Sequence, residues 1–131
     1  MAAQAAEDSV IERSPKIPTV EEFKNVLTAI AREPKWMKLL LAHYHAPGRT
    51  MSATQLAEAV GYEDYRGVNL QYGKLGYKVG KALQHTPTVT YADGRPIWTW
   101  VLATGKRTDG GEWIWTLRPE LAQALEELQL V

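Results

Sequence analysis

The chain has 131 residues, of which 15 are basic and 15 acidic, so its formal net charge is zero. Hydrophobic residues make up 45% of it, which is ordinary for a globular protein, and the length fits one domain with a substantial core. It contains no cysteine, which excludes disulfides and thiolate metal sites.

No apolar run approaches the roughly 20 residues that a membrane-spanning helix needs. Residues 1 to 18 also lack the basic start and apolar stretch of a signal peptide. We therefore expect a cytoplasmic protein of bacterial or phage style that contacts no membrane. The three histidines, His43, His45 and His85, form no ligand pattern. We expect them at the surface and predict no bound metal and no cofactor.

The neutral total conceals an uneven distribution of charge. Residues 66 to 107 carry seven basic side chains against one acidic side chain, Asp93, a net of +6, and the rest of the chain is correspondingly acidic. A basic segment of this kind favours a polyanionic partner, while acidic flanks limit unspecific binding. The competing interpretation is a solvated surface whose charges are balanced by acidic neighbours in space.

Residues 1 to 18 are predicted to form an N-terminal tail, because mixed charges and two prolines leave no sustained apolar stripe. A helix is predicted to begin at the capping box formed by Thr19 and Glu22. Pro34 ends this helix or turns it. A second helix follows over "KWMKLLLAHYH", with Trp36 in its apolar face.

Two further helices are predicted in the middle of the chain. In "MSATQLAEAVGY", Ser52 and Gln55 form a second capping box, and Gly61 supplies the left-handed residue that ends the helix. The next helix covers residues 68 to 83, "VNLQYGKLGYKVGKAL". Its predicted buried stripe consists of Val68, Tyr72, Leu75, Val79 and Ala82.

The pattern then changes to that of strands. "IWTWVLA" (97 to 103) and "EWIWTL" (112 to 117) alternate and are rich in β-branched and aromatic residues. The polar loop "TGKRTDGG" between them predicts an antiparallel hairpin with a basic tip, and Pro119 begins a C-terminal helix. The expected fold is α+β: four helices, a two-stranded hairpin and a final helix, in one domain over residues 19 to 131.

The helix predicted over 68 to 83 has three distinct faces. One is the apolar stripe, and a second is a narrow stripe of small residues, Asn69, Gly73, Gly76 and Gly80. The third is basic and contains no acidic residue: Gln71, Lys74, Tyr77, Lys78 and Lys81. Each glycine costs a helix about 1 kcal/mol relative to alanine. We expect the glycines to permit close packing against a neighbouring element, although a phosphate chain is the alternative partner.

The segment "MSATQLAEAVGYEDYRGVNLQYGKLGYKVGKAL" resembles a helix-turn-helix unit. "SATQLAEAVG" is similar to the positioning helix and "RGVNLQYGKLGYKVGKAL" to the recognition helix. The two strands and basic loop that follow look like the wing of winged-helix proteins. The resemblance covers residues 36 to 117, and it departs from the family pattern in the acidic turn "YEDY" and in the glycine-rich recognition helix.

The resemblance implies a winged-helix-like fold that binds double-stranded DNA, with the recognition helix in the major groove. "VNLQYGKLG" and the late "W-x-W-x-L-R-P-E" pattern also resemble small domains that accompany HNH-type nucleases in bacterial restriction systems, although no His-Asn-His cluster can be assembled here. The residues that map to the recognition helix and its start are Arg66, Asn69, Gln71, Lys74, Tyr77, Lys78 and Lys81. Those that map to the wing are Arg95, Lys106 and Arg107.

Four tryptophans are expected to lie together on the hairpin. Trp98 and Trp100 share one face of the first predicted strand, and Trp113 and Trp115 share one face of the second. Cross-strand aromatic pairs of this kind stabilise a hairpin. The alternative is a stacking platform for a flipped or modified base.

Phosphate loops, nucleophile elbows and metal clusters are all missing from the sequence, so we predict that the protein is not an enzyme. The leading hypothesis is a DNA-binding protein acting in transcriptional control or in recognition of modified or foreign DNA. The alternative is a small phage-style inhibitor, of antirestriction or anti-CRISPR type, whose basic face binds a nucleic-acid-processing protein. A third possibility is a dimerisation domain, so both a monomer and a homodimer are consistent with the sequence.

Overall fold

The computed structural model describes residues 17 to 30 and 33 to 131. These residues form five α-helices and a small three-stranded antiparallel sheet. The helices are α2 (Val20–Ile30), α3 (Pro34–His45), α4 (Ala53–Val60), α5 (Tyr65–Leu83) and α6 (Pro119–Glu127). The strands are β1 (Thr50–Ser52), β2 (Ala103–Arg107) and β3 (Trp113–Leu117), and two short 3-10 turns are η1 (Pro47–Arg49) and η2 (Trp98–Val101).

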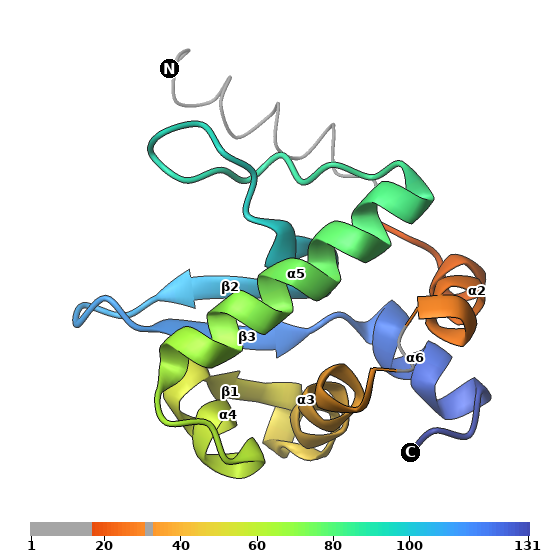
Figure 1. The fold of residues 1–131 in the computed structure, drawn as a ribbon, viewed down its shortest axis with the longest axis horizontal. Coiled ribbons are helices and arrows are strands. Elements are labelled where there is room, and N and C mark those ends of the chain that lie inside the picture. Colours follow the sequence, from red (N-terminus) through yellow and green to blue (C-terminus); the bar gives the residue numbers. More distant parts are fainter. Residues whose placement is uncertain (1–16, 31–32) are drawn as a thin grey trace.

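Figure 1 shows α5 running diagonally across the middle of the molecule, with the β2–β3 hairpin projecting to one side. Helices α2 and α6 lie together near the C-terminal end of α5, where α2 contacts both α5 and α6. Helix α4 lies near its N-terminal end. None of the helices in the described ranges is long and apolar enough to cross a membrane. The tail predicted over residues 1 to 18 falls almost entirely outside the described residues.

The helix boundaries follow the local signals in the sequence. The side chains and backbone N–H groups of Thr19 and Glu22 bond reciprocally, at 2.9 and 3.1 Å, before α2. Ser52 and Gln55 form the same capping box at the start of α4, which satisfies N–H groups that otherwise lack partners. Gly61 ends α4 with a left-handed conformation, φ 86°. These predictions are confirmed.

The sheet corrects the predicted two-stranded hairpin. Its strand order is β1-β3-β2, so the short strand β1 pairs with β3 on the side opposite β2. The prediction of the first hairpin strand over 97 to 103 is also wrong. Strand β2 begins at Ala103 and continues through residues assigned to the loop, whereas Trp98–Val101 forms the η2 turn. The α+β class is therefore confirmed. The sheet has an additional strand, β1, and β2 is shifted toward the C-terminus of the predicted position.

The η2 turn is displaced from the sheet because it packs against α5. A Cβ atom at Gly76 would lie 2.1 Å from the Trp98 carbonyl oxygen, and one at Gly80 would lie 2.7 Å from the Trp98 ring. Only a glycine allows backbone to approach a helix this closely. The prediction that the glycines permit close packing is therefore confirmed at Gly76 and Gly80.

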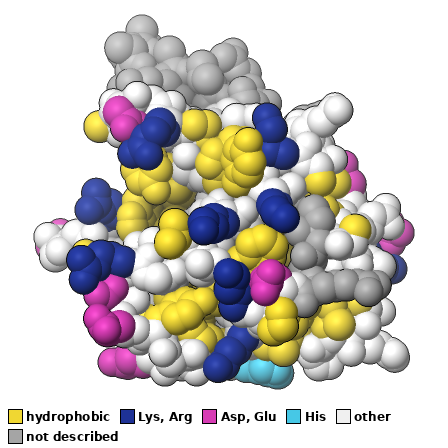
Figure 2. All heavy atoms as spheres, viewed as in Figure 1, with side chains coloured by type: hydrophobic (Ala, Val, Ile, Leu, Met, Phe, Trp, Pro, Cys, Tyr) yellow, Lys and Arg dark blue, Asp and Glu magenta, His cyan; other side chains and the backbone are white. Residues whose placement is uncertain are grey.

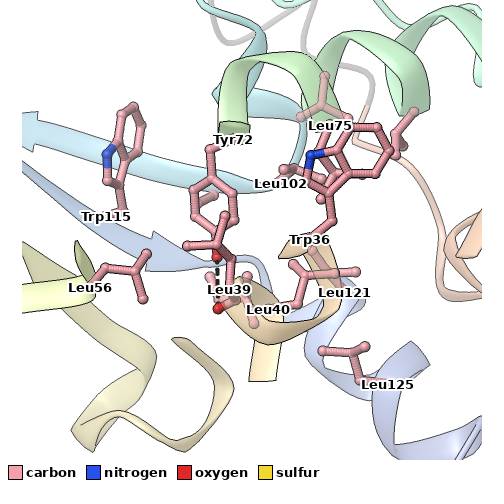
Figure 3. Close-up of a cluster of buried hydrophobic side chains, with 14 of the residues drawn as sticks. Trp36, Leu39, Leu40, Leu56, Tyr72, Leu75, Leu102, Trp115, Leu121 and Leu125 are labelled. Atoms are coloured by element: carbon pink, nitrogen blue, oxygen red, sulfur yellow. Dashed lines mark hydrogen bonds between the residues drawn. The ribbon is translucent and has the colours of Figure 1, made fainter. Parts of the chain in front are cut away.

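The core lies between the sheet, α5 and the helices on either side of them. Figure 3 shows Trp36 and Leu39 of α3, Tyr72 of α5 and Trp115 of β3 among its buried side chains. The stripe predicted for α5 is buried at Val68, Tyr72, Leu75 and Val79. Ala82 was predicted in the same stripe but is exposed, because it lies at the edge of the arc near the end of the helix.

His43 is also part of this core, which contradicts the prediction that the histidines lie at the surface. Its Nε2 donates to the Trp115 carbonyl oxygen at 2.9 Å, and since a carbonyl only accepts, Nδ1 of the neutral ring accepts from the Tyr72 hydroxyl at 2.8 Å. Burial lowers the pKa of His43 below its usual 6.5. His85 is buried too, whereas His45 is exposed as predicted.

Candidate nucleic-acid interface

The solvent-facing side of α5 is basic along its whole length. The nineteen residues of the helix include no aspartate or glutamate. The large side chains that it exposes are cationic, aromatic or aliphatic: Tyr65, Arg66, Leu70, Lys74, Tyr77, Lys78 and Lys81. In Figure 2, Lys and Arg side chains are spread over the face that α5 crosses, with hydrophobic side chains between them, and acidic side chains lie mainly toward its margin.

The three lysines of α5 form no ion pair within the described residues. Instead, two of them lie over aromatic rings: the Lys78 ammonium is 5.5 Å from the centre of the Trp36 ring, and that of Lys81 is 5.8 Å from the centre of the Tyr77 ring. Such contacts orient a side chain without neutralising its charge. The positive charge of Lys74, Lys78 and Lys81 is therefore available to an anionic partner.

Two other predicted cations are already paired with carboxylates. Arg66 contacts Asp64, the N-cap residue of α5, at 2.6 Å, and Arg95 contacts Asp93 at 2.7 Å. Hydrogen bonds from Arg66 and Arg95, chiefly a side-chain bond in the first pair and a backbone bond in the second, lower the pKa values of the two carboxyl groups. These arginines therefore contribute less net charge to the surface than the +6 of the sequence segment suggests.

The two amide side chains that map to the recognition helix, Asn69 and Gln71, are less exposed than the lysines. The Trp36 ring N–H donates to Gln71 Oε1 at 3.1 Å, so the oxygen of Gln71 is occupied within the protein. Asn69 is half-buried, and its enclosed side-chain oxygen has no hydrogen-bond partner among the described residues. Asn69 is therefore the amide with unused hydrogen-bonding capacity.

A groove runs along the exposed side of α5. Its volume is about 660 Å³, and its walls are α5, the turn that follows Thr90 and the start of η2, with Trp36 of α3 at its edge. That turn is closed by a Thr90–Pro96 bridge and by hydrogen bonds between Tyr91, Gly94 and Arg95. The described residues that line the groove include no acidic side chain: Trp36, Asn69, Leu70, Gly73, Lys74, Tyr77, Lys78, Tyr91, Arg95, Pro96, Trp98 and Thr99.

The hairpin presents its two cations on opposite faces. In the register of β2 and β3, Gly105 pairs with Trp115 and Arg107 with Trp113, while Lys106 pairs with Ile114. Because side chains alternate along a strand, Arg107 shares the face of the buried Trp115, and Lys106 lies on the other. Arg107 donates to the Gly111 carbonyl oxygen at 3.1 Å and lies over the Trp113 ring at 5.5 Å.

The tryptophans do not form one group. Trp113 and Trp115 stack with centroids 4.9 Å apart, and Trp100 meets both rings edge-on. Trp98 lies elsewhere and meets the Tyr77 ring edge-on at 5.0 Å. The three clustered rings cover one another, which is the arrangement expected for hairpin stabilisation, whereas Trp98 borders the groove.

Four groove residues were not singled out from the sequence: Leu70, Tyr91, Pro96 and Thr99. Leu70 projects from the basic arc of α5, so a helical wheel could have found it. Tyr91 and Pro96 belong to the wall only because their turn folds back beside α5, and no local pattern signals that contact.

Within the described residues, no group of three or more histidine or acidic side chains could hold a metal ion. Comparison of the chain with protein-family models, curated proteins and solved structures finds no match.

Proposed function

We propose that this protein binds double-stranded DNA through the exposed face of α5, with the β2–β3 hairpin as a second contact. The observation that carries the proposal is the row of three lysines, free of ion pairs to any described residue, on a helix without acidic residues. Lysines in such a row neutralise phosphates and orient a helix on a duplex. The function served is transcriptional control or the recognition of modified or foreign DNA.

The arrangement of elements supports a winged-helix-like mode of binding. Helix α4, a turn that begins with left-handed Gly61, and α5 capped by Asp64 follow the order of a helix-turn-helix. The hairpin β2–β3 then follows in the position of a wing, and β1 extends the sheet on its far side without changing that order. In this mode α5 enters the major groove, and Arg107 and Lys106 reach the phosphates from opposite sides of the hairpin.

Fluorescence anisotropy with a labelled duplex tests the proposal. Affinity should fall as salt rises from about 50 to 200 mM, and Lys74→Gln with Lys78→Gln should reduce the slope of log K against log salt by about 1.8, since each phosphate contact contributes roughly 0.9. The matched control is Lys35→Gln with Lys38→Gln on α3, which makes the same charge change on exposed positions of another helix. No binding at low salt, or binding independent of salt, would contradict the proposal.

A protein partner is the second candidate function, and Leu70 is the observation that favours it. Its side chain is 56% exposed in the middle of the basic face, where it lines the groove. Large exposed apolar groups are commoner at protein interfaces than at phosphate contacts. A purified complex that survives nuclease treatment and is lost in Leu70→Ser, with duplex affinity unchanged, would support this candidate over DNA binding.

A further inference from the structure

The groove beside α5 is too small for a DNA duplex but has the size of sites that hold small molecules. Its 660 Å³ lies within the range of roughly 300 to 1,000 Å³ typical of ligand pockets. A duplex lying on the lysines of α5 would therefore leave the groove empty unless a base left the stack. Enzymes and binding proteins that act on bases extrude them into pockets of this kind.

Two exposed tyrosine rings flank the groove and are held in position by neighbours. Tyr77, 48% exposed, meets the ring of Trp98 edge-on at 5.0 Å. Tyr91, 44% exposed, has the Arg95 guanidinium 5.1 Å from its ring centre. Each ring has one cation over it, Lys81 for Tyr77 and Arg95 for Tyr91, and each residue remains exposed enough for stacking. Bases of any sequence stack on such rings.

Gly73 also lines the groove, about one helical turn before Tyr77, and leaves the backbone of α5 bare there. A Cβ atom placed on Gly73 would meet nothing within 4 Å, in contrast to one on Gly76 or Gly80. The packing of the protein therefore does not explain this glycine, although it lowers helix stability. An occupant of the groove that comes close to the helix backbone would explain it.

The charges around the groove select an anionic occupant. Lys74 and Lys78 line it without ion pairs to the described part of the chain, and the third cation, Arg95, is shared with Asp93. Asn69 lines it as well, and its side-chain oxygen lacks a partner among the described residues. The described lining therefore offers two lysines and one amide, and no carboxylate, to an occupant.

We propose that the groove binds an unpaired nucleotide of a DNA strand. Its base stacks on Tyr77 or Tyr91, its sugar lies against Gly73, and its phosphate contacts Lys74 and Lys78. This inference rests on the proposed DNA binding and adds a ligand for one part of the surface. It distinguishes the protein from a reader of intact duplexes, because a bulged, mismatched or single-stranded site would bind more tightly than a perfect duplex.

Three labelled probes test the inference with the full chain: a ten-residue oligothymidine, a perfect duplex, and the same duplex with one bulged thymidine. The bulged duplex should bind at least about fivefold more tightly than the perfect one. Tyr77→Ala with Tyr91→Ala should weaken oligothymidine and bulged-duplex binding about tenfold or more, as loss of base stacking does. The perfect duplex should lose clearly less affinity, because it offers no unpaired base to stack on the tyrosines.

A second variant fills the groove and leaves the tyrosines in place. Gly73→Leu adds a side chain in open space on a helix that leucine favours, so it should fold, and it should weaken binding of the bulged duplex and oligothymidine alone. The matched control is Ala82→Leu, which adds bulk at an exposed position of α5 outside the groove lining and should bind all three probes as the wild type does.

The outcomes separate this inference from the proposed function. If the chain binds the perfect duplex and the groove variants leave all three affinities unchanged, the inference is overturned and DNA binding stands. Equal losses on every probe would also overturn it, because they would show a general contact in place of a nucleotide site. If the wild type binds none of the probes but binds a labelled peptide of alternating Asp and Tyr in a Gly73-sensitive manner, both proposals fail and the groove is a peptide site.

Discussion

The glycine stripe of α5 serves two purposes in different parts of its length. Toward the C-terminal end of the helix, Gly76 and Gly80 are required because the backbone and ring of Trp98 occupy the space of their missing side chains. About one turn nearer the N-terminal end, Gly73 has open space before it. The comparison shows that one stripe of glycines can be rigidly packed over part of its length and still keep accessible backbone over the rest, so each glycine needs its own explanation.

The largest expected effect disrupts the packed part of the glycine stripe. Gly76→Ala places a Cβ atom 2.1 Å from the Trp98 carbonyl oxygen, so η2 or α5 must move. Overpacking of this severity costs about 3 kcal/mol, far more than the helix gains from alanine. Urea denaturation should therefore show a much lower midpoint than for the wild type. A midpoint equal to or above the wild-type value would show that η2 is not packed as described.

A second effect concerns the buried anchor of α5, the bond between Tyr72 and His43. His43→Gln should cost about 2 kcal/mol at pH 7.5, because it disturbs bonds to the Tyr72 hydroxyl and the Trp115 carbonyl. Thermal melts should show the loss. The matched control is His85→Gln, which makes the same substitution at the other buried histidine and leaves the Tyr72 anchor intact.

The pH dependence of this anchor follows from the lowered pKa of His43. The unfolded chain takes up a proton near pH 6.5, whereas the folded chain takes it up only at lower pH, so the folded state loses stability as pH falls below 6.5. The difference in unfolding free energy between wild type and His43→Gln should therefore shrink on acidification. A difference that stays constant from about pH 8 to about pH 5 would contradict the buried neutral ring.

Gly73→Ala sharpens the comparison at the open part of the glycine stripe. The new methyl group meets no neighbour, and alanine in a helix interior is favoured over glycine by about 1 kcal/mol. The variant should therefore be more stable than the wild type, in contrast to Gly76→Ala. A loss of stability in the same denaturation assay would mean that Gly73 is confined like its neighbours.

The smallest expected effect separates the paired from the unpaired cations. Arg95 is neutralised locally by Asp93, so Arg95→Ala should change duplex affinity by less than about twofold, in keeping with the small energies of exposed ion pairs. At low salt, Lys78→Ala should weaken duplex affinity more than Arg95→Ala does. Asp93→Asn should have the opposite sign and strengthen binding, and anisotropy titrations of the three variants rank them directly.

Local chemistry made most of the helices predictable. The capping boxes, Gly61 and Pro119 each fix a helix boundary through residues within one turn of it. The strands were harder, because β1 has only three residues and exists through its pairing with β3. "WTWV" alternates like a strand but forms η2, since the glycines of α5 provide a surface on which it packs.

The candidate site was predictable in composition and only partly in geometry. Lys74, Lys78 and Lys81 are exposed along one side of α5, as the helical wheel indicates. The pairing of Arg66 with Asp64 lay within two residues and could have been anticipated. The groove could not, because its second wall is a turn around Tyr91 whose position depends on tertiary packing beside α5.

The stacked indoles of Trp113 and Trp115 have an optical consequence. Their rings lie 4.9 Å apart and within 13° of parallel, across from the bare backbone of Gly105. Two identical chromophores so close and rigidly oriented couple their electronic transitions, which produces circular dichroism bands that isolated tryptophans lack. The hairpin can therefore be followed by ultraviolet circular dichroism separately from the helices. Docking of DNA against Arg107 would change the signal of Trp113 first, because the guanidinium of Arg107 lies over that ring.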